Sequence, residues 1–278
     1  MQRILVPTEF TYLSKCALNL GMQLAKLANA EVRIASVVEP LHNDFMEERD
    51  EYSHDPTSSI RNIEITEEAR ARMHERAEEV SKWFPDQIIA PKILFGNKVK
   101  SLVKEVNEQA IDLVIMGGDL YEPKDLQSNE FLRQSNSPVV ILKCMINQLE
   151  KFKDIIFLAD VDNDSEKLIS HAKELQSLLK AKIHVVRVNT PKNFLAPKRC
   201  KETLENFVSR CRLENTELVS LEAKTEIEGL MSYCETIKNA FVCLGIHERS
   251  FLQSLITSSI SEGEVIANSI HPVWTFKD

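Results

Sequence analysis

The sequence predicts an α/β protein of two tandem domains, each an open, doubly wound sheet of five parallel strands. The second half repeats the first, because residues 4–9 (ILVPTE) return as residues 155–160 (IIFLAD) and residues 32–37 (VRIASV) return as residues 183–188 (IHVVRV), 151 positions later in both cases. Short runs rich in β-branched residues alternate with segments of helical period, as in βαβ units. A chain of 278 residues is long enough for two domains with separate cores.

The apolar runs of the first half are continuous rather than alternating, which is typical of parallel strands buried on both faces. We expect strands at residues 4–7, 32–38, 88–95, 113–116 and 139–142. Apolar side chains that recur every three or four residues from Leu13 to Leu27 predict the first helix. Further helices are expected at residues 65–84, 99–106 and 126–134. The polar, acidic residues 41–63 predict an exposed or disordered loop.

The second half follows the same order, with right-handed crossovers between its parallel strands. We expect its strands at residues 155–159, 183–188, 217–221, 241–244 and 273–276. We expect its helices at residues 165–179, 197–211, 226–238 and 251–268. The predicted domains are therefore 1–147 and 153–278. The join between them is too short for a flexible tether, so the halves should pack together.

Composition excludes several classes of function. The net charge of −8 argues against nucleic acid or an anionic membrane as the main partner. No apolar run approaches the roughly 20 residues that span a bilayer, and the first residues lack a signal-peptide pattern, so we expect a cytoplasmic protein. The six cysteines form no CxxC pair and the seven histidines are scattered, so we expect neither structural disulfides nor a metal site. Cys200 and Cys211 lie in a polar helical segment that suggests exposure.

Ligands of open α/β sheets bind beyond the carboxyl ends of the strands. Both halves place polar or small residues there. In the first half these are Thr8 and Glu9 after the first strand and Gly117 and Gly118 after the fourth. In the second half they are Asp160 and residues 245–250 (GIHERS).

The same residues resemble the universal stress protein family over nearly the whole chain, as two copies. Residues 4–10 (ILVPTEF) are similar to the family's first strand with its acidic residue, residues 112–117 (DLVIMG) to its fourth strand, and residues 137–140 (SPVV) to the start of its fifth. Residues 245–250 resemble its Gly-Thr-His-Gly-Arg-Ser turn. Members that bind ATP carry Gly-x-x-Gly, nine residues and then Gly-Ser or Gly-Thr, with backbone amides around the phosphates.

Neither half keeps that phosphate-binding pattern. In the first half Leu120 stands at the second glycine, and the segment that would carry Gly-Ser is deleted. In the second half Glu248 stands at the second glycine, where its charge would repel phosphate by roughly 1–4 kcal/mol at intermediate dielectric. Ser258 and Ser259 occupy the Gly-Ser position without the glycine that permits close backbone approach.

The resemblance nevertheless implies a set of candidate residues in each half. The candidate nucleotide-binding residues of the second half are Asp160, Val188, Gly245, His247, Arg249, Ser258 and Ser259. The degenerate cleft of the first half comprises Thr8, Glu9, Val37, Gly117 and Gly118. The functional interpretations have structural alternatives. Asp160 would cap the next helix near Asn163, and Glu9 would cap a helix or pair with a lysine. His247 and Arg249 would belong to a solvated turn, and Ser258 and Ser259 would begin a helix or lie within it.

We therefore expect a non-enzymatic protein of stress adaptation that acts through its surfaces, with no cofactor and an unidentified protein partner. The resemblance implies that the two halves pair through their fifth strands, residues 139–142 and 273–276, which would cover two sheet edges. A further homodimer of whole chains stays open. The first alternative is a switch that binds ATP or another adenine nucleotide in the second-half cleft. The second is an enzyme of related architecture, although no catalytic motif is present.

Overall fold

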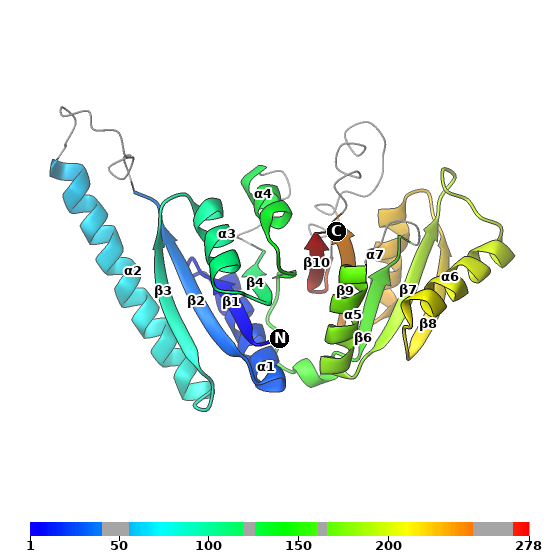
Figure 1. Cartoon of the computed structure of the whole chain (residues 1–278), viewed down its shortest axis with the longest axis horizontal. Coiled ribbons are helices and arrows are strands. Elements are labelled where there is room, and N and C mark those ends of the chain that lie inside the picture. The colour runs from blue at the N-terminus through cyan, green and yellow to red at the C-terminus, as the bar shows by residue number, and fades with distance from the viewer. Residues whose placement is uncertain (41–55, 119–125, 161–165, 247–268, 278) are drawn as a thin grey trace.

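The computed structural model describes residues 1–40, 56–118, 126–160, 166–246 and 269–277 (Figure 1). The first half contains β1 (Arg3–Pro7), α1 (Tyr12–Ala28), β2 (Glu31–Val38), α2 (Pro56–Trp83), β3 (Ile89–Phe95), α3 (Lys98–Glu108), β4 (Leu113–Gly117), α4 (Leu126–Gln134) and β5 (Val139–Leu142). A short 3-10 turn, η1 (Leu149–Lys151), lies in the join. The second half contains β6 (Asp154–Leu158), α5 (Glu166–Leu179), β7 (Lys182–Asn189), α6 (Pro197–Cys211), β8 (Thr216–Glu222), α7 (Glu226–Thr236), β9 (Ala240–Ile246) and β10 (Val273–Lys277).

One sheet of ten strands runs through the molecule in the order β3-β2-β1-β4-β5-β10-β9-β6-β7-β8. The strands of each half are parallel to one another, which confirms the predicted fold class of two doubly wound five-stranded units. The two units meet where β5 and β10 pair antiparallel, with Val140 opposite Trp274. This junction confirms the expected pairing of the two fifth strands. The halves consequently lie side by side, with the junction in the middle of the molecule (Figure 1).

Helices cover both faces of this sheet, and each face carries one apolar core that continues from half to half. Helices α1, α2, α5 and α6 supply the core of one face, and α3, α4 and α7 supply the core of the other. In α6 the inward residues are Cys200, Leu204 and Phe207, which recur at helical spacing. Cys200 is therefore buried, and the expectation that it is exposed is wrong, because the polar residues of α6 lie on its other faces.

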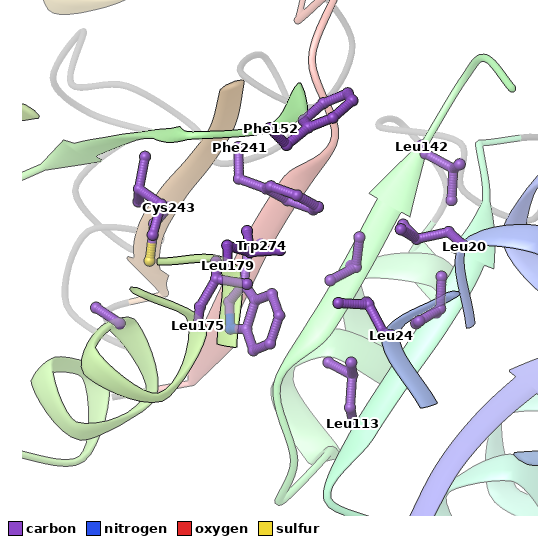
Figure 2. Close-up of a cluster of buried hydrophobic side chains, with 14 of the residues drawn as sticks. Leu20, Leu24, Leu113, Leu142, Phe152, Leu175, Leu179, Phe241, Cys243 and Trp274 are labelled. Carbon is purple, nitrogen blue, oxygen red and sulfur yellow. The ribbon is translucent and has the colours of Figure 1, made fainter. Parts of the chain in front are cut away.

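Buried apolar side chains from both halves face one another at the junction and belong to one core cluster (Figure 2). The indole of Trp274 is 0% exposed, on the second-half side of this cluster. Leu20 and Leu24 of α1 face it from the first half (Figure 2). The N-terminal amino group of Met1 adds an ion pair across the halves, 2.8 Å from Oε1 of Glu174 in α5.

The join is fixed by α1. The side-chain amide of Gln23 donates to the carbonyl oxygen of Ile146 over 2.6 Å, and its oxygen accepts from the backbone N–H of Leu149 over 3.0 Å. Leu149 and Phe152 are buried in the core. These contacts explain why the connection is not a tether.

The second helix of the first half is longer than the sequence predicts. It begins at Pro56 rather than at residue 65, so the expectation of a loop is wrong for residues 56–63. Proline is favoured at the first position of a helix, and the Ser-rich residues after it have ordinary propensities that the polar composition concealed. The remaining residues of that predicted loop, 41–55, and the predicted helix at 251–268 lie outside the described residues.

Candidate functional site

The candidate cleft of the first half lies at the carboxyl ends of β1 and β4. Thr8, directly after β1, is buried, and its backbone N–H donates to the carbonyl oxygen of Ala35 over 2.8 Å. Glu9 forms an ion pair with Lys98, the first residue of α3. Of the structural alternatives for Glu9, pairing with a lysine is confirmed. The carboxylate of this cleft is thus already neutralised by the chain itself.

A lysine stem lies beside Gly118 of the same cleft. The backbone N–H of Gly118 donates to the carbonyl oxygen of Leu142 over 2.7 Å. A Cβ atom at Gly118 would lie 2.9 Å from Cγ of Lys143, so this stem lies directly against the glycine backbone. Burial lowers the pKa of Lys143 from its ordinary value. Gly117 ends β4, and half-buried Val37 packs against the apolar core on the α3 side of the sheet.

At the second-half cleft Asn193, which no sequence pattern indicates, forms a set of hydrogen bonds. Its side-chain oxygen accepts from the backbone N–H of Thr190 over 2.6 Å. Its amide nitrogen donates to the carbonyl oxygen of Val188 over 3.3 Å and to Oε1 of Glu226 over 2.6 Å. Its own carbonyl oxygen accepts from Nη2 of Arg187 over 3.2 Å. The carbonyl oxygen of Val188, a candidate nucleotide-binding residue, therefore already accepts a bond from Asn193.

In this cleft the charge of Asp160 acts on Glu226, at the positions where the first half has the Glu9–Lys98 ion pair. Glu226 is the first residue of α7, as Lys98 is of α3, and Asp160 follows β6, as Glu9 follows β1. Burial raises the pKa of Glu226 above its ordinary value, and the charge of Asp160 raises it further, while Arg187 and the bond from Asn193 lower it. The second cleft is therefore electrostatically unlike the first.

Two buried polar atoms near the carboxyl end of β7 have no hydrogen-bond partner among the described residues. They are Nε of Arg187 and Oδ1 of Asn189. The side-chain amide nitrogen of Asn189 donates to the carbonyl oxygen of Leu195 over 3.1 Å. An unpaired buried donor or acceptor costs roughly 1–3 kcal/mol. The cleft thus keeps some unused hydrogen-bonding capacity.

The remaining candidate residues divide into two groups. Gly245 lies in β9, opposite Phe276 of β10. His247, Arg249, Ser258 and Ser259 lie outside the described residues, as does Asn163 of the helix-cap alternative for Asp160. Asn193 and Glu226 are not among the residues predicted from the sequence. Glu226 had a signal, because it stands 128 positions after Lys98, the offset that relates residue 113 to residue 241.

A separate polar network lies at the opposite end of the second-half strands. Nε2 of His184 is 2.9 Å from Oδ1 of Asp154, and Nδ1 is 2.8 Å from the hydroxyl of Tyr233. Burial raises the pKa of Tyr233 to about 12, helped by the charges of Glu217 and Asp154. The phenol therefore stays protonated near neutral pH, where it can donate a hydrogen bond but is a poor nucleophile.

Neither a metal centre nor a membrane span emerges from the part of the chain that the structure describes. Within those ranges, no three histidine, cysteine, aspartate or glutamate side chains gather closely enough to hold an ion. The helices among the same residues are too short or too polar to cross a bilayer.

The sequence profile of the universal stress protein family matches residues 1–143. Among solved structures, a universal stress protein from Archaeoglobus fulgidus DSM 4304 aligns with 99% of this chain and 98% of its own at 16% identity, with a TM-score of 0.70. One from Pseudomonas aeruginosa UCBPP-PA14, described as putative, aligns with 100% of this chain and 93% of its own at 14% identity and a TM-score of 0.61.

A shorter universal stress protein, solved in complex with cAMP, covers 51% of this chain and 96% of its own at 22% identity, with a TM-score of 0.38. No curated protein sequence resembles the chain closely enough to count as a match. The profile match covers just over half of the sequence, and two structures of the same family share the fold along nearly the full length. The chain belongs to the universal stress protein family.

Proposed function

We propose that this chain is a non-enzymatic universal stress protein of the cytoplasm, which works through its surfaces and binds no triphosphate. The observation that carries the proposal is that polar groups at both candidate clefts already pair with side chains of the chain itself. In the first half Glu9 is paired with Lys98, and the stem of Lys143 lies against Gly118. In the second half the side-chain amide of Asn193 donates a hydrogen bond to the carbonyl oxygen of Val188.

Charge supports the same conclusion in the second half. Asp160 and Glu226 face the cleft together, and like charges repel an incoming phosphate. Because the pKa of Glu226 is raised, this residue loses its charge, and with it its share of the repulsion, only at the acidic pH values where it is protonated. A ligand with three phosphate groups would also have to displace Asn193 and break four side-chain hydrogen bonds, to Thr190 (two), Val188 and Glu226.

The proposal that the protein catalyses no reaction is supported by the chemistry of the polar clusters among the described residues. The network around His184 has its histidine between a carboxylate and a phenol whose pKa is raised, which does not activate a nucleophile. A hydrolase or transferase would need an activated group beside a place for substrate.

One observation favours the alternative of an adenine-nucleotide switch. Nε of Arg187 is a buried donor without a partner in the described residues, and it lies near Asp160 and Glu226. A ligand able to displace Asn193 would find this donor available. ATP would then be the cofactor of the second half.

Titration calorimetry with ATP and magnesium tests the proposal. We expect no saturable heat from the wild-type chain and no product released from the nucleotide over hours. Saturable binding that Asp160→Ala abolishes would refute the proposal and establish the switch. Asn193→Ala is the informative second variant: binding that appears only when Asn193 is removed would show that this side chain blocks an otherwise competent cleft.

A further inference from the structure

A cationic, partly aromatic surface lies on the connection between β7 and α6 and on the first turns of α6. We call this surface the cationic patch. It consists of Lys192, Phe194, Lys198, Arg199 and Lys201, all of which are exposed. No aspartate or glutamate occurs between Glu174 and Glu202, although the chain as a whole has a net charge of −8. A local excess of positive charge therefore stands out on an acidic protein.

The positions of these cations oppose helix stability. The N-cap of α6, Ala196, makes no side-chain hydrogen bond, and the first turn has no acidic residue. Lys198 and Arg199 stand there instead, at the positive end of the helix dipole, where each cation is unfavourable by a few tenths of a kcal/mol to about 1 kcal/mol. Helix α7 shows the usual arrangement, with Thr225 as a capping side chain and Glu226 in the first turn.

Among the described residues, the charges of Lys198 and Arg199 are left unpaired and that of Lys201 is only weakly paired. Lys201 approaches Oε1 of Glu205 at 3.8 Å, an exposed pair of little strength. Lys198 and Arg199 have no ion pair with any residue in the described ranges. The first half offers a comparison, because α2 also begins with a proline, Pro56, but continues with uncharged residues 57–60. The cations are thus a property of the second copy alone and not a requirement of the fold.

An aromatic side chain completes the surface. Phe194 is 60% exposed, directly after Asn193. Asn193 is held by four side-chain hydrogen bonds, and Leu195 is held through its carbonyl oxygen by Asn189. The ring is therefore presented by an anchored loop, so that little backbone entropy is lost when a partner contacts it. The groups that fill the second cleft thus also position this surface.

We propose that the cationic patch is the docking surface for an acidic protein segment that carries an apolar side chain. The carboxylates of the segment pair with Lys198 and Arg199, and its apolar side chain packs on Phe194. This inference rests on the proposed function, of which it names the partner class.

Charge complementarity selects a short protein segment over the larger polyanions. Electrostatic interactions are screened over about 8 Å at physiological salt, so a short segment responds mainly to the patch. A nucleic acid or an anionic membrane extends along the molecule and meets the repulsion of a chain whose net charge is −8. A compact acidic partner can therefore bind the cationic patch without meeting the negative charge of the rest of the chain.

Fluorescence anisotropy of a labelled dodecapeptide tests this inference on the full-length chain. The peptide has glutamates and aspartates around a central leucine pair, and it is titrated at low and at physiological salt. We expect Lys198→Glu with Arg199→Glu to weaken binding at least about tenfold. We expect Phe194→Ala to weaken it about threefold or more, with an unchanged circular dichroism spectrum. The matched control, Lys180→Glu with Lys238→Glu, makes the same change in net charge at the opposite ends of the strands and should leave affinity within about twofold.

Three outcomes would overturn the inference. They are no peptide binding even at low salt, equal loss in the control variant, and tighter binding of single-stranded DNA or of phosphatidylserine vesicles that the Lys198 and Arg199 changes abolish. ATP is titrated into the same samples. Nucleotide binding would refute the proposed function without altering the peptide result, and loss of peptide binding alone would refute only the docking surface.

Discussion

Trp274 allows a quantitative test of the junction between the halves. Its indole is 0% exposed, and Nε1 is buried without a hydrogen-bond partner among the described residues. Replacement by alanine removes packing and leaves a cavity, which costs about 3–5 kcal/mol in the free energy of unfolding. Replacement by phenylalanine keeps most of the apolar contact and removes the unpaired donor. Relief of about 1–3 kcal/mol of desolvation should offset the smaller ring, so that Trp274→Phe costs less than about 1.5 kcal/mol.

Urea unfolding followed by far-ultraviolet circular dichroism measures both variants. Trp83 is 77% exposed and provides the control, because Trp83→Phe should change the free energy of unfolding by less than about 0.5 kcal/mol. If Trp274→Phe is as costly as Trp274→Ala, the indole N–H has a partner and the reasoning is refuted. If Trp274→Ala costs under about 1 kcal/mol, the junction does not hold the halves together.

Three smaller changes test the second half by thermal unfolding. Glu226→Gln should stabilise the protein at pH 7, because burial raises the pKa of this carboxyl in the folded state, so that its ionisation costs stability as pH rises. The gain in stability should vanish below the ordinary pKa of 4.5, and a loss of stability at pH 7 would contradict the prediction. Gly229→Ala should lower the free energy of unfolding by about 1–3 kcal/mol, because its Cβ would lie 2.6 Å from Cγ1 of Val188. Adding Val188→Ala should recover part of that loss, and a neutral effect of Gly229→Ala would show that there is free space beside Gly229. Tyr233→Phe should cost about 1 kcal/mol through loss of the 2.8 Å contact with Nδ1 of His184, and an unchanged melting temperature would argue against that bond.

The sequence was informative about elements whose pattern is strong. The continuous apolar runs located the strands to within a few residues, because buried parallel strands need apolar side chains on both faces. Helices α4 and α6 begin and end at the predicted residues. The start of α2 was missed, since Ser, Thr and Asn suit loops and helix ends alike. The resemblance to a family, rather than periodicity, predicted the pairing of β5 with β10.

The candidate clefts were less predictable. The sequence showed that the glycines of a phosphate loop are missing, but it could not show what replaces the ligand. Asn193 bonds to four residues, of which only Glu226 is distant in sequence, and an asparagine after a strand usually indicates only a turn. Pairing of Glu9 with a lysine was one of its stated alternatives, but the partner Lys98 lies 89 residues away. Contacts over such separations leave no local pattern.

The covalent linkage of the two copies has a consequence for stoichiometry. In a symmetric homodimer every mutation appears twice, and each surface is displayed in duplicate. Here the antiparallel meeting of β5 and β10 builds the equivalent assembly from one chain, so each copy can change alone. The result is a molecule with two chemically different ends, β3 and β8, to which an asymmetric partner can attach once and in a single orientation.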